Sequence, residues 1–462
     1  MGTATDKAIG VAVLALCLAA GAQAKSHPSK IGQGAAPGGR VAQSGKTVRR
    51  TRIADDSLAR AEAAIDKKDF PVAEQALQQA VQTDPQNYRA WYDLGFVYNI
   101  TGRQQEAMDA YRKSVAAKPD VFESNLNLGL ILAQAGDASA EKYLRAATAL
   151  KPTSNANENI AHAWLALGQL LRKSDPKRAL EAYAKVSQLL PGDPGPHLSA
   201  ALIADRAKNF ATAEKEYQAA ARLDPKSVEA AAGLANVYME TLRMEEAEQA
   251  LRRYLAIAEQ AAPAEGGRAV QTASAHVQLG RVLLELHRRA EAITEFEEAL
   301  KLAPGDPKAP GQLAWLYLQD KQYDKAEAQF RWLLEKSPKD AEMHHGLGSA
   351  LLQQRKFPEA QQEFIQAVQL KGDLSEAYAD LASAASENKN YALTLKALDA
   401  RVKFVPENPY TLFLRATALD HLGDKVNASN SYRDFLAAAN GKYPDQEWQA
   451  RHRLIAIDPK KK

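Results

Sequence analysis

Apolar residues recur at helical spacing along most of the chain. In residues 88–121, Trp91, Leu94 and Tyr98 fall three or four positions apart, which places them on one face of a first helix. Gly102 follows this run and is expected to end the helix, because glycine is the common residue just past a helix C-terminus. The pattern therefore predicts an amphipathic helix that closes in a tight turn.

A second apolar run follows this turn and predicts a second helix. Ala107 and Tyr111 lie on one face of it, and Pro119 is expected to stop it because proline lacks an N–H group. Gly95 of the first helix and Ala107 of the second are small, as two helices that cross closely require. The unit is therefore predicted to be an antiparallel helix pair, with Tyr111 filling the gap to the next pair.

The same pattern recurs along the chain, mostly at intervals of 34 residues. A small residue is followed four positions later by an aromatic residue or Leu in eleven pairs: Ala73/Leu77, Ala107/Tyr111, Ala140/Leu144, Ala179/Tyr183, Ala213/Tyr217, Ala247/Leu251, Ala292/Phe296, Ala326/Phe330, Ala360/Phe364, Thr394/Leu398 and Ala428/Tyr432. A proline follows eight positions later in eight of them: Pro85, Pro119, Pro152, Pro191, Pro225, Pro304, Pro338 and Pro406. A fixed period of this length predicts a stacked repeat array.

This arrangement resembles the tetratricopeptide repeat (TPR) over about residues 54–440. The resemblance implies an all-α fold: a right-handed superhelical solenoid of antiparallel helix pairs, here about eleven repeats. It also implies a concave groove lined by the first helices that takes an extended peptide or a helix of a partner protein. Each repeat buries its apolar face only against its neighbours.

The chain opens with two segments that lack this period. Residues 1–24 read as a secretory signal, because an apolar run, Ile9–Ala20, precedes the small-x-small site that ends at Ala24. Cleavage there would remove Cys17, the only cysteine, although Cys17 could instead be lipidated or the segment retained as an anchor. Residues 25–53 are expected to form a disordered basic linker, since 25–52 carry seven Lys or Arg and no acidic residue.

Irregularities in the period suggest a division of the array. An insertion at 261–267, with two adjacent glycines at its end, is the best candidate for a hinge. It separates a first half, 54–260, of about six repeats from a second half, 268–440, of about five. Residues 441–462 are expected to form a capping helix, with Trp448, Leu454 and Ile455 covering the last apolar face, and a basic tail.

The sequence contains no catalytic or metal-binding motif with the required spacing, so we expect no enzyme activity and no cofactor or metal. The nine histidines are scattered, and His276 and His344 occupy equivalent repeat positions, which packing explains. Phosphate-cradling and dinucleotide-binding glycine motifs are also absent. The repeats leave little room for a catalytic domain.

The candidate site is the groove expected from the resemblance. Projecting the helical period places nine residues on it: Tyr92, Phe96, Asn99, Leu126, Asn127, Leu130, Gln169, Arg281 and Trp315. In the first half these residues are mostly apolar, and their amides could bond a peptide backbone. Alternatively, they could pack against the first helix of the next repeat. The second half is more polar, with Trp315 as a candidate anchor.

These observations predict a non-enzymatic protein–protein interaction scaffold that is exported, periplasmic or secreted. It would bind peptides or helical segments, with no small-molecule substrate. Two alternatives remain. One is binding of nucleic acid or of an anionic polymer or lipid through residues 25–52, although the rest of the chain, 53–462, is mildly acidic at −4. The other is a regulatory role beside a separate envelope enzyme.

Overall fold

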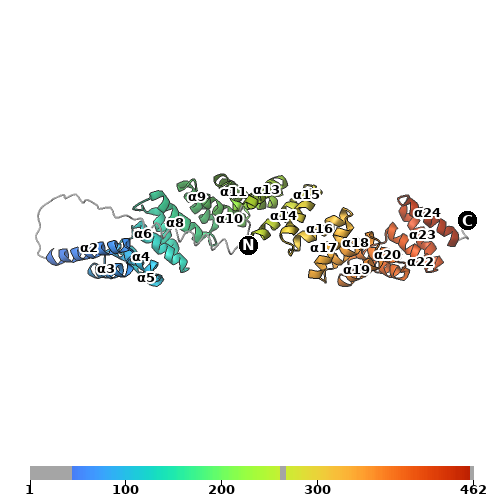
Figure 1. Cartoon of the computed structure of the whole chain (residues 1–462), viewed down its shortest axis with the longest axis horizontal. Coiled ribbons are helices and arrows are strands. Elements are labelled where there is room, and N and C mark those ends of the chain that lie inside the picture. Colours follow the sequence, from blue (N-terminus) through green and yellow to red (C-terminus); the bar gives the residue numbers. More distant parts are fainter. Residues whose placement is uncertain (1–43, 261–266, 458–462) are drawn as a thin grey trace. The chain divides into compact units, whose positions relative to one another are not determined.

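The computed structural model describes residues 44–260 and 267–457, and all the regular elements in these ranges are helices (Figure 1). The chain divides into two compact units, of which the first ends at Val237 and the second begins at Tyr238. The predicted signal, residues 1–24, lies outside the described residues. So do the linker up to residue 43 and the tail from 458.

In the first unit, successive helices pack against each other in antiparallel pairs. Their bounds are α2 Ser44–Asp66, α3 Phe70–Thr83, α4 Tyr88–Ile100, α5 Gln104–Ala117, α6 Phe122–Gln134, α7 Ala140–Ala149, α8 Ala156–Leu171, α9 Pro176–Leu189, α10 Gly195–Arg206 and α11 Phe210–Leu223. Helix α12, Val228–Glu240, contains the boundary between the units.

The second unit repeats this arrangement and ends in a single helix. Its bounds are α13 Met244–Gln260, α14 Gly267–Glu285, α15 Arg289–Leu302, α16 Lys308–Gln319, α17 Tyr323–Lys336, α18 Ala341–Gln353, α19 Phe357–Leu370, α20 Ser375–Glu387, α21 Tyr391–Arg401, α22 Pro409–His421, α23 Lys425–Ala439 and α24 Pro444–Ile457. With α12 counted beside α13, the helices form eleven pairs followed by α24. The all-α paired architecture is confirmed, and the handedness of coiling stays a prediction.

The small residue of each first helix makes room for a large side chain of its partner helix. A Cβ atom added to Gly95 of α4 would lie 2.7 Å from the Tyr111 ring of α5, and one added to Gly348 of α18 would lie 2.7 Å from Phe364 of α19. Both distances are far inside van der Waals contact. Tyr111 and Phe364 are accordingly almost fully buried.

The same aromatic position also contacts the next first helix. Gly233 of α12 faces the Tyr217 ring of α11, and Gly346 of α18 faces the Phe330 ring of α17, both too closely for a side chain. Each ring is thus held between its own pair and the following one. This confirms the prediction that the aromatic residue fills the gap between successive repeats.

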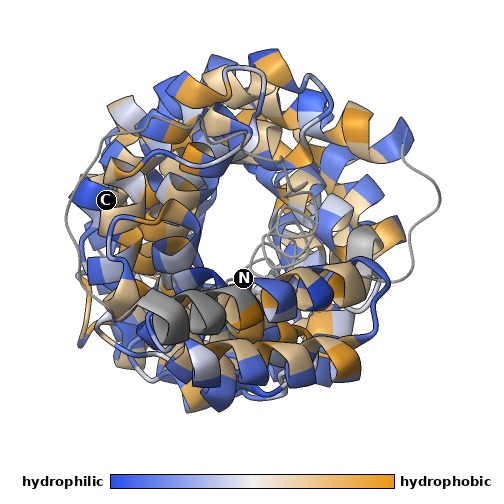
Figure 2. Cartoon of the chain, turned by 90° about the vertical axis from the view of Figure 1, so that its left-hand side faces the viewer, coloured by the Kyte–Doolittle hydropathy of each residue, from blue (hydrophilic) through white to orange (hydrophobic). Residues whose placement is uncertain are grey.

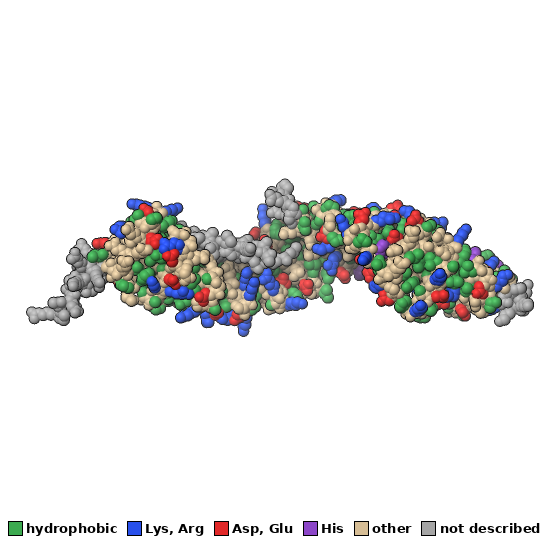
Figure 3. All heavy atoms as spheres, turned by 90° about the horizontal axis from the view of Figure 1, so that it is seen from below, with side chains coloured by type: hydrophobic (Ala, Val, Ile, Leu, Met, Phe, Trp, Pro, Cys, Tyr) green, Lys and Arg blue, Asp and Glu red, His purple; other side chains and the backbone are tan. Residues whose placement is uncertain are grey.

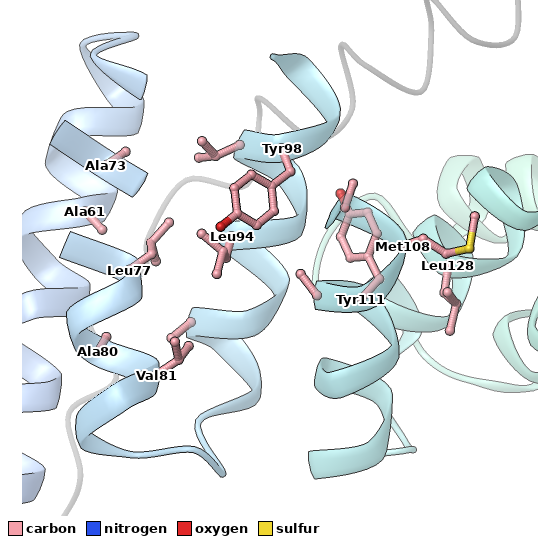
Figure 4. Close-up of a cluster of buried hydrophobic side chains, with 14 of the residues drawn as sticks. Ala61, Ala73, Leu77, Ala80, Val81, Leu94, Tyr98, Met108, Tyr111 and Leu128 are labelled. Atoms are coloured by element: carbon pink, nitrogen blue, oxygen red, sulfur yellow. The ribbon is translucent and has the colours of Figure 1, made fainter. Parts of the chain in front are cut away.

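Buried side chains form a continuous core from α2 to α7. Figure 4 shows Leu77, Leu94, Tyr98 and Tyr111 reaching between α3, α4 and α5. Figure 2 shows the alternation that produces this core, with hydrophobic and hydrophilic residues on different sides of individual helices. The burial is periodic along each helix, as expected for an array held together by neighbouring repeats.

The turn within every helix pair except α8/α9 uses one residue in the left-handed conformation. Gly102 has φ of +78°, as the sequence predicts, but Lys321 and Leu242 adopt the same conformation at +60° and +59°. A residue with a Cβ atom is strained there, by roughly 1 kcal/mol. The turn geometry is therefore imposed by the packing of the two helices rather than by glycine alone.

Ion pairs connect successive second helices. The glutamate after the small residue accepts from a basic side chain that precedes the next second helix, as in Arg103–Glu74 at 2.8 Å and Lys356–Glu327 at 2.8 Å. Burial acts to raise the pKa of Glu327, but bonds from Lys356, Arg331 and Gln354 outweigh it and lower this pKa to about 2. Glu327 is therefore a charged link between α17 and the turn before α19.

The first helix begins earlier than predicted. The expected linker extends to residue 53, whereas α2 starts at Ser44. No proline or glycine interrupts residues 46–66, and Ala54, Leu58 and Ala61 continue a buried stripe along one face. Helix can therefore propagate back from this packed face into the basic segment.

The predicted halves of the array do not coincide with the two units. The units separate within α12, while the proposed hinge lies mostly outside the described residues, which stop at 260 and resume at 267. The helices that flank the insertion are long, at 17 residues in α13 and 19 in α14, and they pack against each other. The additional sequence thus extends the helices of one unit.

The closing helix α24 packs against α23, but only Leu454 of the three residues expected on its packed face lies there. Ala450 is buried and Leu454 contacts the core around Phe435. Trp448 and Ile455, which the sequence pattern assigned to this face, are exposed. The assignment of these two residues was therefore wrong.

Candidate peptide-binding faces

Predicted groove residues of the first unit lie on three successive first helices, and together they define the α4/α6/α8 face. Tyr92, Phe96 and Asn99 belong to α4; Leu126, Asn127 and Leu130 to α6; Gln169 to α8. All are half-buried except Leu126, whose exposed fraction is 9%.

Leu126 belongs to the core rather than to an open face. It joins a buried cluster with Phe122 and Leu144, and Leu130 packs against the same cluster. Helices α6 and α8 contact each other, so a large side chain on this side of α6 is covered by the next first helix. For Leu126, the packing alternative left open by the sequence is the correct one.

Tyr92 connects α4 to α6. Its hydroxyl oxygen accepts a hydrogen bond of 3.0 Å from the Asn127 side-chain amide, and its ring lies 5.8 Å from that of Tyr111. Burial raises the pKa of Tyr92 well above its ordinary value, with smaller contributions from Asp93 and Glu123. Tyr92 therefore stays neutral and positions Asn127, so these two predicted residues are brought together.

Gln169 presents an unused hydrogen-bond donor. Its Nε2 atom is buried and has no partner among the described residues. Because a buried donor without a partner costs about 1–3 kcal/mol, such an atom calls for an explanation. The atom is closed to solvent, so a bound segment could supply the missing acceptor only after the Gln169 side chain turns toward the face.

Asp93 is an unusual carboxylate on the same helix. Burial raises its pKa to about 7; Glu62 adds to this rise, and Arg89 opposes it. No hydrogen bond to Asp93 is found among the described residues. The sequence placed Asp93 on this side only as a negative charge, and its burial, which depends on neighbouring helices, could not be seen.

The equivalent surface of the second unit, the α16/α18/α20 face, is built from polar pairs. His345 Nε2 lies 2.8 Å from Asp380 Oδ2, and the Ser349 hydroxyl donates to the His345 carbonyl at 3.0 Å. Next to it, the hydroxyls of Ser383 and Tyr410 lie 2.8 Å apart. The predictions missed Asp380, Ser383 and Tyr410, because nothing in one helix shows which side chain of the next lies opposite.

Trp315 and Arg281 occupy different environments. Trp315 is half-buried on α16, and its ring meets Phe330 edge to face at 5.0 Å. Arg281 is exposed on α14. Trp315 is thus a preformed aromatic edge, whereas the structure gives Arg281 no defined place in a site.

The histidines expected to serve packing do so. His276 Nδ1 lies 2.7 Å from Glu295 and His344 Nδ1 2.6 Å from Glu363, each joining the two helices of one pair. His197 and Glu216 repeat the contact in the first unit at 2.6 Å. Across residues 44–260 and 267–457, no group of three or more His, Cys, Asp or Glu side chains could hold a metal ion. Nor is any helix there long and apolar enough to span a bilayer.

Comparison with known protein families identifies the type of repeat that these paired helices form. The model of the "Cilia and flagella-associated protein 70 middle TPR-like domain" matches residues 56–190, and a "Tetratricopeptide repeat" model matches 204–269 and 283–350. The chain is a tetratricopeptide repeat protein. TPR domains bind peptide partners, and this TPR protein therefore belongs to the general class of protein–protein interaction scaffolds.

Individual relatives are more distant. The chain is 30% identical over 117 residues to the "Tetratricopeptide repeat and J domain-containing co-chaperone DNJ1" of Cryptococcus neoformans var. grubii, a match over 25% of this chain and 21% of that protein. The TPR chain thus matches about a fifth of the length of this relative.

Three solved structures illustrate the range of similarity. YrrB, described as having an unusual peptide-binding site, is 22% identical, covers 43% of this chain and 96% of its own, and gives a TM-score of 0.37. PilF of Pseudomonas aeruginosa is 19% identical, with 48% and 97% covered and a TM-score of 0.37. Yeast Tom70 is 16% identical, with 88% and 96% covered and a TM-score of 0.30.

Proposed function

We propose that this TPR protein is an exported, non-enzymatic scaffold that binds partner peptides or helices on its α4/α6/α8 face. The observation that carries the proposal is the unpartnered Nε2 of Gln169 on the same face as the half-buried rings of Tyr92 and Phe96. A bound segment would place apolar side chains on the rings and a carbonyl oxygen near the amide. The α16/α18/α20 face, with Trp315, is a second surface of different chemistry.

Selection from a displayed peptide library, followed by affinity measurement by fluorescence anisotropy, tests this proposal. We expect Phe96→Asp to abolish binding, and Gln169→Ala to weaken it by about tenfold, the loss of one to two kcal/mol from a hydrogen bond. Trp315→Ala on the other face is the matched control and should leave these peptides bound. Peptides that bind equally well to the Phe96 and Gln169 variants would exclude this face.

Export rests on residues 1–24, whose apolar run and cleavage pattern support the proposal. Fractionation of the producing cell, with N-terminal sequencing of the mature protein, tests it. A mature chain that begins at Lys25 outside the cytoplasm is the expected result. An intact N-terminus in the cytoplasmic fraction would refute export.

A second candidate function rests on charge. Residues 25–52 carry seven basic and no acidic residues, and the basic stretch continues into the N-terminal part of α2. This segment would bind nucleic acid or an anionic polymer with strong salt dependence. Changing Arg49, Arg50 and Arg52 to Gln removes three of these seven charges, so it should weaken the binding and lower its salt slope. Unchanged binding would reject this function.

A regulatory role beside a separate enzyme is the remaining alternative. It predicts that one enzyme co-purifies with the full chain and that Phe96→Asp or Trp315→Ala releases it. Recovery of non-enzymatic partners alone would favour the scaffold.

A further inference from the structure

The carboxylate of Asp93 on α4 accepts no hydrogen bond and makes no ion pair among the described residues. Figure 3 shows Lys and Arg side chains interspersed with Asp and Glu over the surface, and pairs such as Arg103–Glu74 bring them within 2.8 Å. Asp93 has no such contact, although its side chain is half-buried. A half-buried acceptor without a donor calls for an explanation.

The register of the repeats explains why Asp93 has no donor. The bond between Tyr92 and Asn127 joins successive first helices across 35 residues, and a bond of the same span recurs in the second unit. Asp93 holds the position in its repeat that Asn127 holds in the next. The residue 35 positions before Asp93 is Leu58, which is buried and cannot donate a hydrogen bond.

The charged groups near Asp93 do not neutralise it. Burial is the main cause of its raised pKa, Glu62 of α2 adds to the rise, and Arg89 of α4 opposes it. The Arg89 Nε atom donates instead to the hydroxyl of the preceding tyrosine, at 3.3 Å. Tyr92 and Tyr111 of α5 are also nearby, and both stay neutral because burial raises their pKa values. With Asp93 ionised, these groups carry one excess negative charge.

Asp93 lies beside the rings of the α4/α6/α8 face. Phe96 follows it by three residues, so the two share one side of α4, and Asp93 is near enough to Tyr92 to contribute to the raised pKa of that tyrosine. Both rings are half-buried. A long basic side chain suits such a place, because its methylene groups pack on apolar surface while its charged end reaches a carboxylate.

We propose that the α4/α6/α8 face selects a partner segment that carries a lysine or arginine, whose cationic end bonds Asp93 while its methylene groups lie against Phe96. This proposal rests on the peptide-binding function proposed for that face and names the chemistry of its partner. Asp93 is then a specificity-determining residue, since the bound cation supplies the donor that Leu58 does not. A segment with an acidic side chain at this place is repelled by Asp93 and Glu62.

Peptides selected from a displayed library on the full chain at pH 8 test this inference by fluorescence anisotropy. The probe is a selected peptide that the Phe96→Asp variant does not bind, synthesised with its basic residue and with norleucine in that place. We expect norleucine to weaken binding by about tenfold, the loss of one charged hydrogen bond. The Asp93→Asn variant should bind both peptides equally. Asp109→Asn, which removes an exposed aspartate of α5 in the same unit, is the matched control and should keep the tenfold difference.

The pH dependence of binding gives a second readout. Because the pKa of Asp93 is about 7, its carboxyl group is mainly protonated at pH 6 and mainly ionised at pH 8. Affinity for the basic peptide should therefore rise by about tenfold between these pH values, whereas affinity for the norleucine peptide should not rise. Asp93→Asn should abolish the rise, which separates the effect of this carboxylate from that of any histidine.

Failure of this inference and failure of the proposed function give different results. Selected peptides that depend on Phe96 but contain no basic residue, or that bind equally well with norleucine, overturn the role of Asp93 and leave the peptide-binding face standing. A preference for the basic peptide that persists in Asp93→Asn overturns it as well. If no selected peptide depends on Phe96, the proposed function fails and the inference fails with it.

Discussion

The α4/α6/α8 face and the α16/α18/α20 face use the same helix positions for different chemistry. In the first unit Asn127 donates to Tyr92, and in the second His345 pairs with Asp380. Each pair joins two successive first helices and spans 35 residues. The repeat thus sets where two side chains meet, and the local sequence sets whether they form a neutral or an ionisable pair.

The carboxylates on the two faces also have different surroundings. Asp93 is half-buried and has no hydrogen-bonding partner among the described residues, and desolvation raises its pKa to about 7, whereas Asp380 has His345 beside it. An unpaired carboxylate destabilises the fold when it ionises, and a paired one contributes a bond. The comparison teaches that stability is reduced on the face we propose to bind peptides.

The largest expected effect on stability tests whether the helix pairs behind the two faces are packed in the same way. Gly95→Val and Gly348→Val each insert atoms where a Cβ alone would lie 2.7 Å from an aromatic ring. We expect each to lower the free energy of unfolding of its unit by about 3 kcal/mol. Denaturation in urea measures this. Gly192→Ala and Gly305→Ala, which have open space around them, should change it little, and a large loss in only one unit would break the equivalence.

The next effect separates the ion pairs of the two units. Glu327→Gln removes a carboxylate whose pKa is lowered to about 2, so the stabilisation is present above pH 4.5 and is lost as the pH falls toward 2. We expect a loss of about 2 kcal/mol at pH 7. Glu74→Gln at the equivalent position should cost less, because Glu74 accepts from one cation and not from two. Equal losses in urea denaturation would contradict this ranking.

Replacing Asp93 and Asp380 with asparagine should change the stability of their units in opposite directions. Since the pKa of Asp93 is raised to about 7, its ionisation removes stability as the pH rises from about 4 to 7. Asp93→Asn should therefore stabilise the first unit by about 2 kcal/mol at pH 8 and have little effect at pH 4. Asp380→Asn should destabilise the second unit by about 0.5 kcal/mol. Thermal unfolding at both pH values provides the measurement, and a stability gain for Asp93→Asn at pH 4 equal to that at pH 8 would exclude ionisation as its cause.

The smallest expected effect sharpens the role of Tyr92. Tyr92→Phe removes the acceptor of the Asn127 hydrogen bond while keeping the ring. A loss of about 1 kcal/mol is expected, because Asn127 is half-buried and must find water instead. Removing both groups, with Tyr92→Phe and Asn127→Leu, should restore part of this loss in a double-mutant cycle. Additive losses would show that the bond contributes nothing.

The spacing of small and aromatic residues in the sequence predicted the fold, but it predicted the candidate site only in part. Gly95, Ala107 and Tyr111 repeat at positions where helix crossing permits few alternatives, so the pairs were predictable. Leu126 was misplaced because periodicity identifies the side of a helix but not the neighbour that covers it. The role of Asp380 and the unpartnered amide of Gln169 depend on contacts between repeats, which one helix does not reveal. The orientation of Trp448 depends on the bond between Arg453 and Asp420, two residues 33 positions apart in the sequence.

Helix α18 has one further consequence. With Gly346 against Phe330 and Gly348 against Phe364, its backbone is pressed between two rings and has no side chains at these points to rearrange. A displacement of one ring must therefore move the helix and the other ring with it. We expect the pairs α16/α17 and α18/α19 to exchange their amide hydrogens in one cooperative opening event, while pairs whose contacts run through flexible side chains open one at a time.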